Sequence, residues 1–322
     1  MMKPLAEEHP QLFHYTSAAG LDGIMRSQTL RATHYAYLND AAEIRHFLES
    51  RLPQIFETVI LKHRSDEKAA SQLGRQIAES ILDKLLNGAV GKEPLAEPYI
   101  TSFCTPMDKD DRVDQHGLLS QWRGYGKDGG YALVFDTNSL SELLAEFSTK
   151  YENSGHLFAG DVVYSSQDNH IFFNEFAVDL NTMETFLMSH LHGDEDNKNL
   201  EKIFIAVMRC ACRYKHWGFK EENEVRIIFI PNNKEVREYA RSERITINDI
   251  PRKQYIRSGA SIPFVDLLEG VTSLTTPLPI QRVIVGPCAD HKKAKRVRAV
   301  EILLEQHHIS AKVSASEIPY VG

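Results

Sequence analysis

The stretch "LFHYTSAAGLDGIMRSQTLRATHYAYLND" occupies residues 12–40 and predicts the first strand–helix–strand unit of the chain. Strands are expected over residues 12–15 and 30–35, with a helix between them over residues 18–27. The helix is indicated by apolar residues at the spacing of one helix face, Leu21, Ile24 and Met25. Thr16 and Ser17 are the expected helix caps, because short hydroxyl side chains accept hydrogen bonds from the first backbone N–H groups of a helix.

Farther along the chain, strand patterns alternate irregularly with helical blocks. The expected strands cover residues 99–105, 130–136, 160–165, 224–231, 282–287 and 311–314. Helical patterns fill two long segments, at about 41–95 and 168–217, and a basic helix is expected over residues 290–307. This order predicts an α+β fold in a single domain, residues 1–322, with two helical insertions. No G-x-G-x-x-G or G-x-x-x-x-G-K motif supports a doubly wound parallel sheet.

Composition limits the class of protein. The 322 residues are 42% hydrophobic and 25% charged, and no apolar run approaches the roughly 20 residues that cross a bilayer. Glu7 and Glu8 occupy the place of a signal peptide's apolar segment, so we expect a cytoplasmic protein without a membrane partner. The four cysteines predict reduced, structural thiols. A formal net charge of −7 disfavours broad adhesion to a polyanion but leaves a local basic site open.

The densest acidic motif begins the strongest predicted strand. Glu222 and Glu224 are two residues apart, so in extended backbone their side chains would share one face and their carboxylates would converge. Such a pair can divide roles, because the charge of one carboxylate pushes the other toward protonation. The alternative is a solvated charge cluster ahead of an edge strand.

A second motif combines stacking and phosphate-binding side chains. It places Ser120, Trp122 and Arg123 in one short segment that also contains Tyr125. The planar guanidinium of Arg123 suits a phosphate, while Trp122 or Tyr125 can stack on a base. The alternative is that Trp122 anchors the core and Arg123 pairs with an aspartate.

The third element is His14 with Tyr15 at the end of the first strand. A lone histidine on a strand is more often structural than catalytic, but Tyr37 and Asn39 follow the next strand, which returns to the neighbourhood of the first. We therefore expect these residues to form one wall of a nucleotide pocket.

In this order the motifs resemble the bacterial domain of unknown function 2971 family. Its pattern runs HYT/S, Y-L-N-D, Ser-x-Trp-Arg, W-x-x-E-x-E-x-R and V-G-P. The corresponding segments here are residues 14–17, 37–40, 120–123, 217–226 and 285–287. The Trp-to-Glu spacing is slightly longer in this chain, because Lys220 and Glu221 lie between Phe219 and Glu222.

The opening stretch is also similar to ADP-ribosyltransferases of the histidine–tyrosine–glutamate type, although Tyr15 replaces their usual glycine. The resemblance implies an ADP-ribosyltransferase-like mixed/antiparallel split sheet with helical insertions. It assigns His14 to the adenosine-side ribose of NAD, Tyr37 to the nicotinamide and Glu224 to the nicotinamide ribose.

The implied function is NAD-dependent ADP-ribosyl transfer to a macromolecular acceptor (protein, RNA or DNA) by a toxin or phage-defence effector. An antitoxin or immunity protein would be a further partner. Glu224 would stabilise the oxocarbenium-like charge, Glu222 would orient or deprotonate the acceptor, and Arg123 would neutralise the pyrophosphate; no metal is required. The expected NAD-binding residues are His14, Tyr15, Thr16, Tyr37, Asn39, Ser120, Trp122 and Arg123. In this hypothesis His14 and Glu224 line one cleft, bordered by Trp122 and Arg123.

Two other functions remain open at the level of sequence. One is a non-catalytic nucleotide or nucleic-acid binding module of the same fold, whose basic helix contacts phosphate through Lys292, Lys293, Lys295, Arg296 and Arg298. The other is a metal-dependent hydrolase using His190 and His192 with the carboxylates of residues 194–196, although that acidic run is more typical of a solvated loop.

Overall fold

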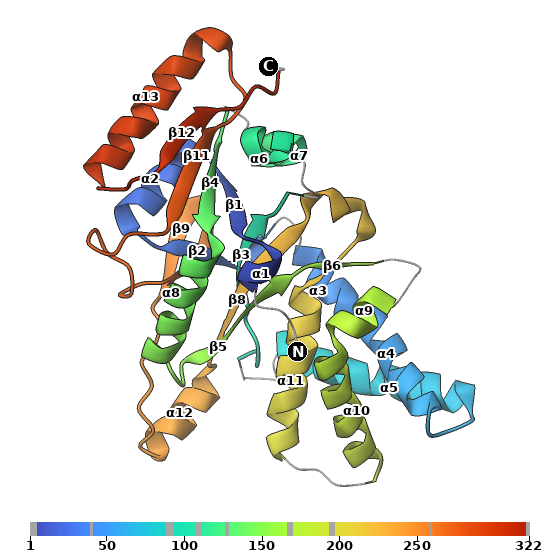
Figure 1. The fold of residues 1–322 in the computed structure, drawn as a ribbon. Helices are drawn as coiled ribbons and strands as arrows, with labels where there is room; N and C mark the ends of the chain where they lie inside the picture. Colours follow the sequence, from blue (N-terminus) through green and yellow to red (C-terminus); the bar gives the residue numbers. More distant parts are fainter. Residues whose placement is uncertain are drawn as a thin grey trace.

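The computed structural model describes residues 5–38, 41–87, 93–106, 111–125, 129–165, 170–192, 197–257 and 259–319. Ten strands of this described part form one mixed sheet, which helices cover on both faces (Figure 1). The strands are β1 (Gln11–Thr16), β2 (Leu30–His34), β3 (Tyr99–Cys104), β4 (Tyr131–Asp136), β5 (Gly155–Asp161), β8 (Glu224–Pro231), β9 (Arg252–Arg257), β10 (Ala260–Leu267), β11 (Ile280–Val285) and β12 (Lys312–Ala315). The α+β class expected from sequence is thus confirmed.

The sheet forks at β3. One edge of β3 pairs with β8 along its whole length, and β8 pairs in turn with β5. The other edge meets β2 at its beginning and β1 at its end, so two wings diverge, β1–β4–β11–β12 and β2–β10–β9. Within the fork, the hydroxyl of Thr101 donates to the carbonyl oxygen of Arg31 at 2.8 Å, and Nδ1 of His14 lies 3.0 Å from the carbonyl oxygen of Ser102. Side chains therefore satisfy main-chain groups where the two wings separate.

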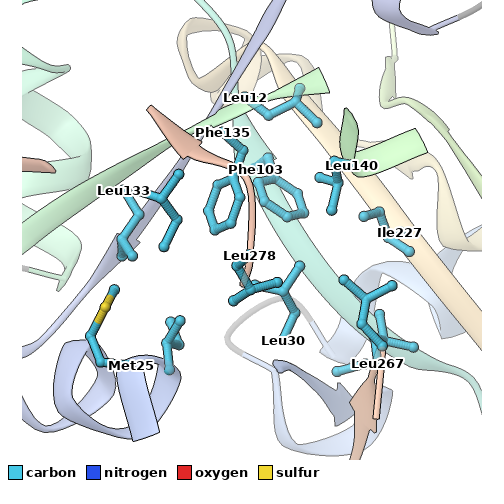
Figure 2. Packing of buried hydrophobic residues seen from close by; sticks show 14 of the residues in the cluster. Leu12, Met25, Leu30, Phe103, Leu133, Phe135, Leu140, Ile227, Leu267 and Leu278 are labelled. Carbon is cyan, nitrogen blue, oxygen red and sulfur yellow. The ribbon is translucent and has the colours of Figure 1, made fainter. Parts of the chain in front are cut away.

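One face of the sheet packs into a large apolar core. The helices that contribute to it are α2 (Ala18–Ser27), α8 (Thr137–Lys150) and α13 (Asp290–Gln306). Figure 2 shows Leu12, Phe103, Phe135 and Ile227 from four different strands meeting in this cluster. The rings of Phe103 and Phe135 contact edge to face, with centroids 5.7 Å apart.

The other face is divided between two apolar clusters. The larger lies under the helical insertions: α3 (Ala41–His46), the π-helical turn η2 (Phe47–Arg51), α4 (Leu52–Leu61), α5 (Glu67–Leu82), the π-helical turn η3 (Asp83–Asn87), α9 (His170–Glu175), α10 (Ala177–Leu191) and α11 (Asn197–Cys212). The smaller packs Trp122 of α7 (Leu119–Tyr125) against Tyr15 and Cys104, beside α6 (Asp111–His116). Ion-paired side chains of β8 lie between these clusters, as described below.

Short elements complete the described chain. These are α1 (Leu5–Glu8), the 3-10 turn η1 (Tyr35–Tyr37), the parallel pair β6 (Val163–Tyr164) and β7 (Tyr214–Lys215), the 3-10 helix η4 (Trp217–Glu222) and α12 (Lys234–Ser242). No helix in the described ranges is both long enough and apolar enough to span a bilayer. The four cysteines are buried and unpaired, and burial raises the pKa of Cys212 to about 12, although the positive charge of Arg226 opposes this.

Several sequence predictions are confirmed and others fail. Helix α2 and strand β8 have the predicted bounds, and the side chain of Ser17 caps α2 by accepting from the Gly20 N–H. The helix expected to continue to residue 217 ends at Cys212, because the chain extends there to pair with β6. The helices α8 and α12 and the β9–β10 hairpin were not predicted from the sequence.

We expect Phe135→Ala to lower the free energy of unfolding by about 3–5 kcal/mol, because Phe135 is fully buried and its removal leaves a cavity beside Phe103. Urea unfolding followed by circular dichroism measures the change. Phe173→Ala is the matched control, since Phe173 is exposed, and it should change stability by less than about 0.5 kcal/mol. Equal losses in the two variants would contradict the packing of this core.

Candidate functional site

The strongest electrostatic feature of the molecule begins at the first residue of β8. Glu224 is 4% exposed, and both of its carboxylate oxygens accept hydrogen bonds from cations. Oε1 accepts from Nε of Arg226 at 2.7 Å, and Oε2 accepts from Nη2 of Arg226 and Nζ of Lys215, each at 3.1 Å. Arg226 reaches Glu224 because residues i and i+2 of a strand share a face.

Two further carboxylates join this arrangement. Nζ of Lys215, which is 2% exposed, donates to Oε2 of Glu222 at 2.8 Å. Nη2 of Arg226 lies 3.6 Å from Oε2 of Glu43 in α3, and its Nη1 donates to the carbonyl oxygen of Cys212 at 2.8 Å. We call Glu43, Lys215, Glu222, Glu224 and Arg226 the buried ion network. With three carboxylates and two cations, it carries one net negative charge when all are ionised.

The network holds Glu224 in its ionised form. Burial by itself would raise the pKa of the carboxyl group, because it disfavours the charged state. The positive charges of Arg226 and Lys215, with hydrogen bonds from Arg226 and Ser102, outweigh burial and lower the pKa of Glu224 to about 2. Glu224 is therefore an anion throughout the neutral range.

Glu222 reaches the network by a different route from the one expected. The sequence prediction placed Glu222 and Glu224 in one extended strand, but Glu222 ends η4 and Asn223 adopts a left-handed conformation with φ of 42°. The backbone N–H of Thr105 fixes this corner by donating to the carbonyl oxygen of Asn223 at 3.0 Å. The two carboxylates converge, as predicted, but through their shared contact with Lys215.

An open cavity of about 830 Å³ lies beside the network. Tyr164, Ile171, Trp217 and Lys220 line it, together with Asp161 and Glu175. Trp217 is 64% exposed, which is unusual for an indole and leaves a ring face open to a ligand. The cavity has the size typical of small-molecule sites, and its lining combines apolar residues with the charged residues Asp161, Glu175 and Lys220.

Tyr164 connects the cavity to the network. Its hydroxyl oxygen accepts a hydrogen bond from the backbone N–H of Glu224 at 2.9 Å. Burial raises the pKa of Tyr164, and the carboxylates of Glu224 and Glu222 favour the neutral phenol further. The phenol therefore remains a hydrogen-bonding group and does not ionise near neutral pH.

A histidine–carboxylate pair lies at the edge of the same cavity. Nε2 of His9 is 2.6 Å from Oδ1 of Asp161. A carboxylate oxygen of Glu8 lies within 4.8 Å of both groups, so the three side chains have the spacing of metal ligands. The hydrogen bond with Asp161 outweighs burial and raises the pKa of His9. We interpret this arrangement as an ion pair.

The structure separates His14 from Glu224. The imidazole of His14 packs against Phe103, with ring centroids 5.5 Å apart, on the face of the large core. Glu224 lies directly opposite Cys104, and adjacent residues of a strand point to opposite faces. The two side chains therefore lie on opposite faces of the sheet, and the expectation that they line one cleft is wrong.

Tyr15 and Trp122 are core residues. Their rings contact edge to face at 4.9 Å, the Tyr15 hydroxyl accepts from the Leu118 N–H, and the Trp122 indole N–H donates to the His116 carbonyl oxygen. Because Trp122 is 4% exposed and Arg123 is exposed, the pair does not border a common cleft. Ser120 is partly buried on the same short helix.

The remaining predicted residues lie elsewhere. Thr16 ends β1 and is partly buried, while Tyr37 is exposed beyond β2, where its carbonyl oxygen accepts from Arg257 at 2.6 Å. Asn39 lies outside the described residues.

The predicted metal ligands make other contacts. His190 stacks on Phe186, and the imidazole of His192 hydrogen-bonds to the carbonyl oxygen of Met188 in its own helix, while residues 194–196 lie outside the described ranges.

The basic helix expected to contact phosphate carries internal pairs. In α13, Lys293 lies 2.9 Å from Asp290, and Arg298 contacts both Glu301 and Glu305. Arg296 lies over the ring of Tyr131, with the guanidinium 4.9 Å from the ring centroid. Much of the positive charge of α13 is thus already compensated or packed.

Sequence reasoning missed Lys215, Glu43, Tyr164 and Trp217 as site residues. Lys215 and Trp217 fell inside the predicted helical insertion, and Tyr164 lay in an unremarkable strand pattern. Glu43 fell inside the first predicted helical insertion. The only available signal was that Trp217 precedes the Glu-x-Glu-x-Arg segment.

Comparison with known proteins connects this region to one family. Residues 121–227 match the family described as Protein of unknown function (DUF2971). The match spans about a third of the chain and includes Lys215, Trp217, Glu222, Glu224 and Arg226. It supports the resemblance to this family of unknown function. Searches of curated proteins and of solved structures returned no match.

We expect Glu224→Gln to lower the free energy of unfolding at pH 7 by about 3–5 kcal/mol, because it leaves two buried cations without a full counter-charge. The pKa of Glu224 is lower in the folded state than in the unfolded state. Its ionisation therefore stabilises the fold above about pH 4.5, and this stabilisation is lost as the pH falls toward about 2.

Urea unfolding of the wild type and variant between pH 2 and pH 8 tests this expectation. The difference between the two should shrink over the acidic range. Glu49→Gln removes a carboxylate from an exposed pair with Arg45 and should change stability by at most about 1 kcal/mol. A Glu224→Gln protein as stable as the wild type at pH 7 would contradict the assignment.

Proposed function

We propose that this protein binds NAD in the cavity beside Trp217 and transfers its ADP-ribose group to a macromolecular acceptor. The observation that carries the proposal is that one 3-10 helix, η4, begins with an exposed indole on the cavity wall, Trp217, and ends with a partly exposed carboxylate, Glu222, which Lys215 holds in place. An indole face stacks on a base or on nicotinamide, and a carboxylate stabilises a ribosyl cation.

The ligand's parts match the chemistry of the cavity wall. Lys220 lines the cavity and can neutralise a pyrophosphate oxygen, while Trp217 offers the stacking surface. Glu222 ends the helical turn that carries both residues, and it is 22% exposed against 4% for Glu224. Of the two carboxylates that Lys215 binds, we therefore assign the contact with the ligand to Glu222, and Glu224 positions it through Lys215.

In the proposed reaction the bond between nicotinamide nitrogen and ribose C1′ breaks, and nicotinamide leaves as a neutral molecule with the bonding electrons. Negative charge on Glu222 stabilises the oxocarbenium-like carbon more than the ground state. An acceptor oxygen or nitrogen then bonds to C1′, and its proton passes to Glu222. Water as the acceptor gives NAD hydrolysis.

A second function, non-catalytic nucleotide binding, is favoured by one specific observation. Both oxygens of Glu224 are occupied by Arg226 and Lys215, and the same lysine engages Glu222. A carboxylate neutralised by buried cations stabilises a substrate cation less. In this function the network would shape the cavity wall, and NAD or another nucleotide would bind without turnover.

We expect Trp217→Ala to weaken NAD binding by about 5- to 150-fold, because stacking on one base contributes on the order of 1–3 kcal/mol. Isothermal titration calorimetry measures the affinity. Tyr239→Ala is the control, since it removes an exposed aromatic ring of α12 that does not line the cavity, and its affinity should equal that of the wild type. If wild-type protein does not bind NAD, the proposed ligand is wrong.

We expect Glu222→Gln to lower nicotinamide release on the order of 10²- to 10³-fold while NAD affinity is retained, because the substitution removes charge and preserves shape. Release is measured by chromatography with and without cell lysate, and labelled NAD identifies the modified acceptor. Glu221→Gln, at the exposed neighbouring position, should keep wild-type activity. NAD binding with no release under any acceptor condition would favour the non-catalytic function.

A further inference from the structure

The wing β2–β10–β9 has two chemically different faces. Its backbone register pairs Asp266 with Arg31, Phe264 with Lys253 and Ile262 with Tyr255. Because paired residues share a face and alternate residues along a strand do too, one face gathers cationic and aromatic side chains. We call Arg31, Lys253, Tyr255, Arg257 and Phe264 the cationic–aromatic face.

The opposite face of the wing accounts for its packing. Leu30, Ala32, Val265 and Leu267 alternate with the residues named above and belong to the large apolar core. The cationic–aromatic face instead leaves Arg31 and Arg257 exposed and Tyr255 partly exposed. Phe264 is covered mainly by its neighbours, since the guanidinium of Arg31 lies 4.9 Å from its ring centroid and 5.4 Å from that of Tyr255. Arg31 is thus held by aromatic rings and not by an acidic side chain.

Charge on this wing opposes the charge of the whole chain. The three strands carry four cationic side chains, Arg31, Arg252, Lys253 and Arg257, against one carboxylate, Asp266. Glu97 and Glu269, which lie outside these strands, contact Arg252 and Lys253, so the local excess is one positive charge in a chain with a formal net charge of −7. A locally positive region of this kind can attract a polyanion, although the net charge of the whole molecule repels one.

Two of these cations have no carboxylate partner in the described part of the chain. Lys253 is neutralised, because its Nζ lies 2.9 Å from Asp266 and 2.6 Å from Glu269. Arg257 donates to the carbonyl oxygen of Tyr37, which leaves its charge uncompensated, and Arg31 only stacks on rings. The side chain of Tyr37 is also exposed beside Arg257.

We propose that the cationic–aromatic face binds single-stranded nucleic acid. Arginine guanidinium groups bind phosphate oxygens in a planar fork, and unpaired bases stack on aromatic side chains of a sheet. Tyr37 and Tyr255 supply the stacking rings, and Arg31 and Arg257 supply the phosphate contacts. The site shares no residue with the cavity beside Trp217, and its occupancy does not require NAD.

Fluorescence anisotropy with labelled 12-nucleotide oligouridylate and oligothymidylate tests the proposal in the absence of NAD. We expect binding at 50 mM salt that weakens steeply as salt is added, as counterion release requires. Arg31→Gln and Arg257→Gln should each reduce the slope of log affinity against log salt by about 0.7. Tyr255→Ala should weaken binding about tenfold, since it removes one stacking ring.

Two controls distinguish binding at the cationic–aromatic face from non-specific attraction to positive charge. Arg298→Gln removes an exposed cation of α13 that is already paired with Glu301 and Glu305, and it should leave affinity and salt slope unchanged. Arg31→Lys keeps the charge but not the planar stacking, so it should restore the salt slope without restoring full affinity. Thermal unfolding of each variant establishes that it is folded at the temperature of the binding assay.

The proposal is overturned if wild-type protein binds neither oligonucleotide at 50 mM salt, or if Arg31→Gln and Arg257→Gln both keep the wild-type salt slope. Equal competition by a DNA duplex or by oligoglutamate would also overturn it, since it would identify a general polyanion surface or one for acidic proteins. Because this assay contains no NAD, its outcome is independent of whether nicotinamide is released.

Discussion

The pairing of Glu224 with Arg226 and Lys215 constrains the centre of the molecule. All three groups are almost completely buried, so none can lose its partners to water without leaving an uncompensated charge in the interior. Lys215 comes from β7, the other two from β8, and Glu43 reaches Arg226 from the first helical insertion. The network therefore couples the insertions to the sheet, and it fixes how β7 and α3 sit over β8.

A buried ion network is a costly way to achieve that coupling. Desolvation of several charges offsets much of their attraction, and apolar residues of similar size often stabilise a core as well or better. The network here lies between two apolar clusters that cover the same sheet face, one under the insertions and one around Trp122. Its contact with Tyr164 joins it to the open cavity, and this location favours a role in a site over a role in stability.

The sequence predicted the local elements better than the relations between them. β8 was predictable because its apolar residues are continuous, whereas the polar strand Arg252–Arg257 offers little hydrophobic signal. Placing His14 requires knowing which face of β1 packs into the large apolar core. Leu12 lies two residues earlier, so its side chain shares a face with that of His14, and its apolar character already indicated that this face packs into the core. The position of Glu222 could not be predicted from the sequence, because the left-handed corner at Asn223 depends on a hydrogen bond from Thr105, more than a hundred residues away.

Two pairs of cations in the described part of the chain differ in what compensates them. Lys215 and Arg226 are enclosed with carboxylates, so their positions follow from folding and their removal unbalances the core. Arg31 and Arg257 remain at the surface of a net-negative chain, held by aromatic rings and a carbonyl oxygen. Folding alone does not require positive charge at the second pair of positions. Because water solvates both guanidinium groups, they can contact phosphate at the proposed nucleic-acid site without first breaking an ion pair.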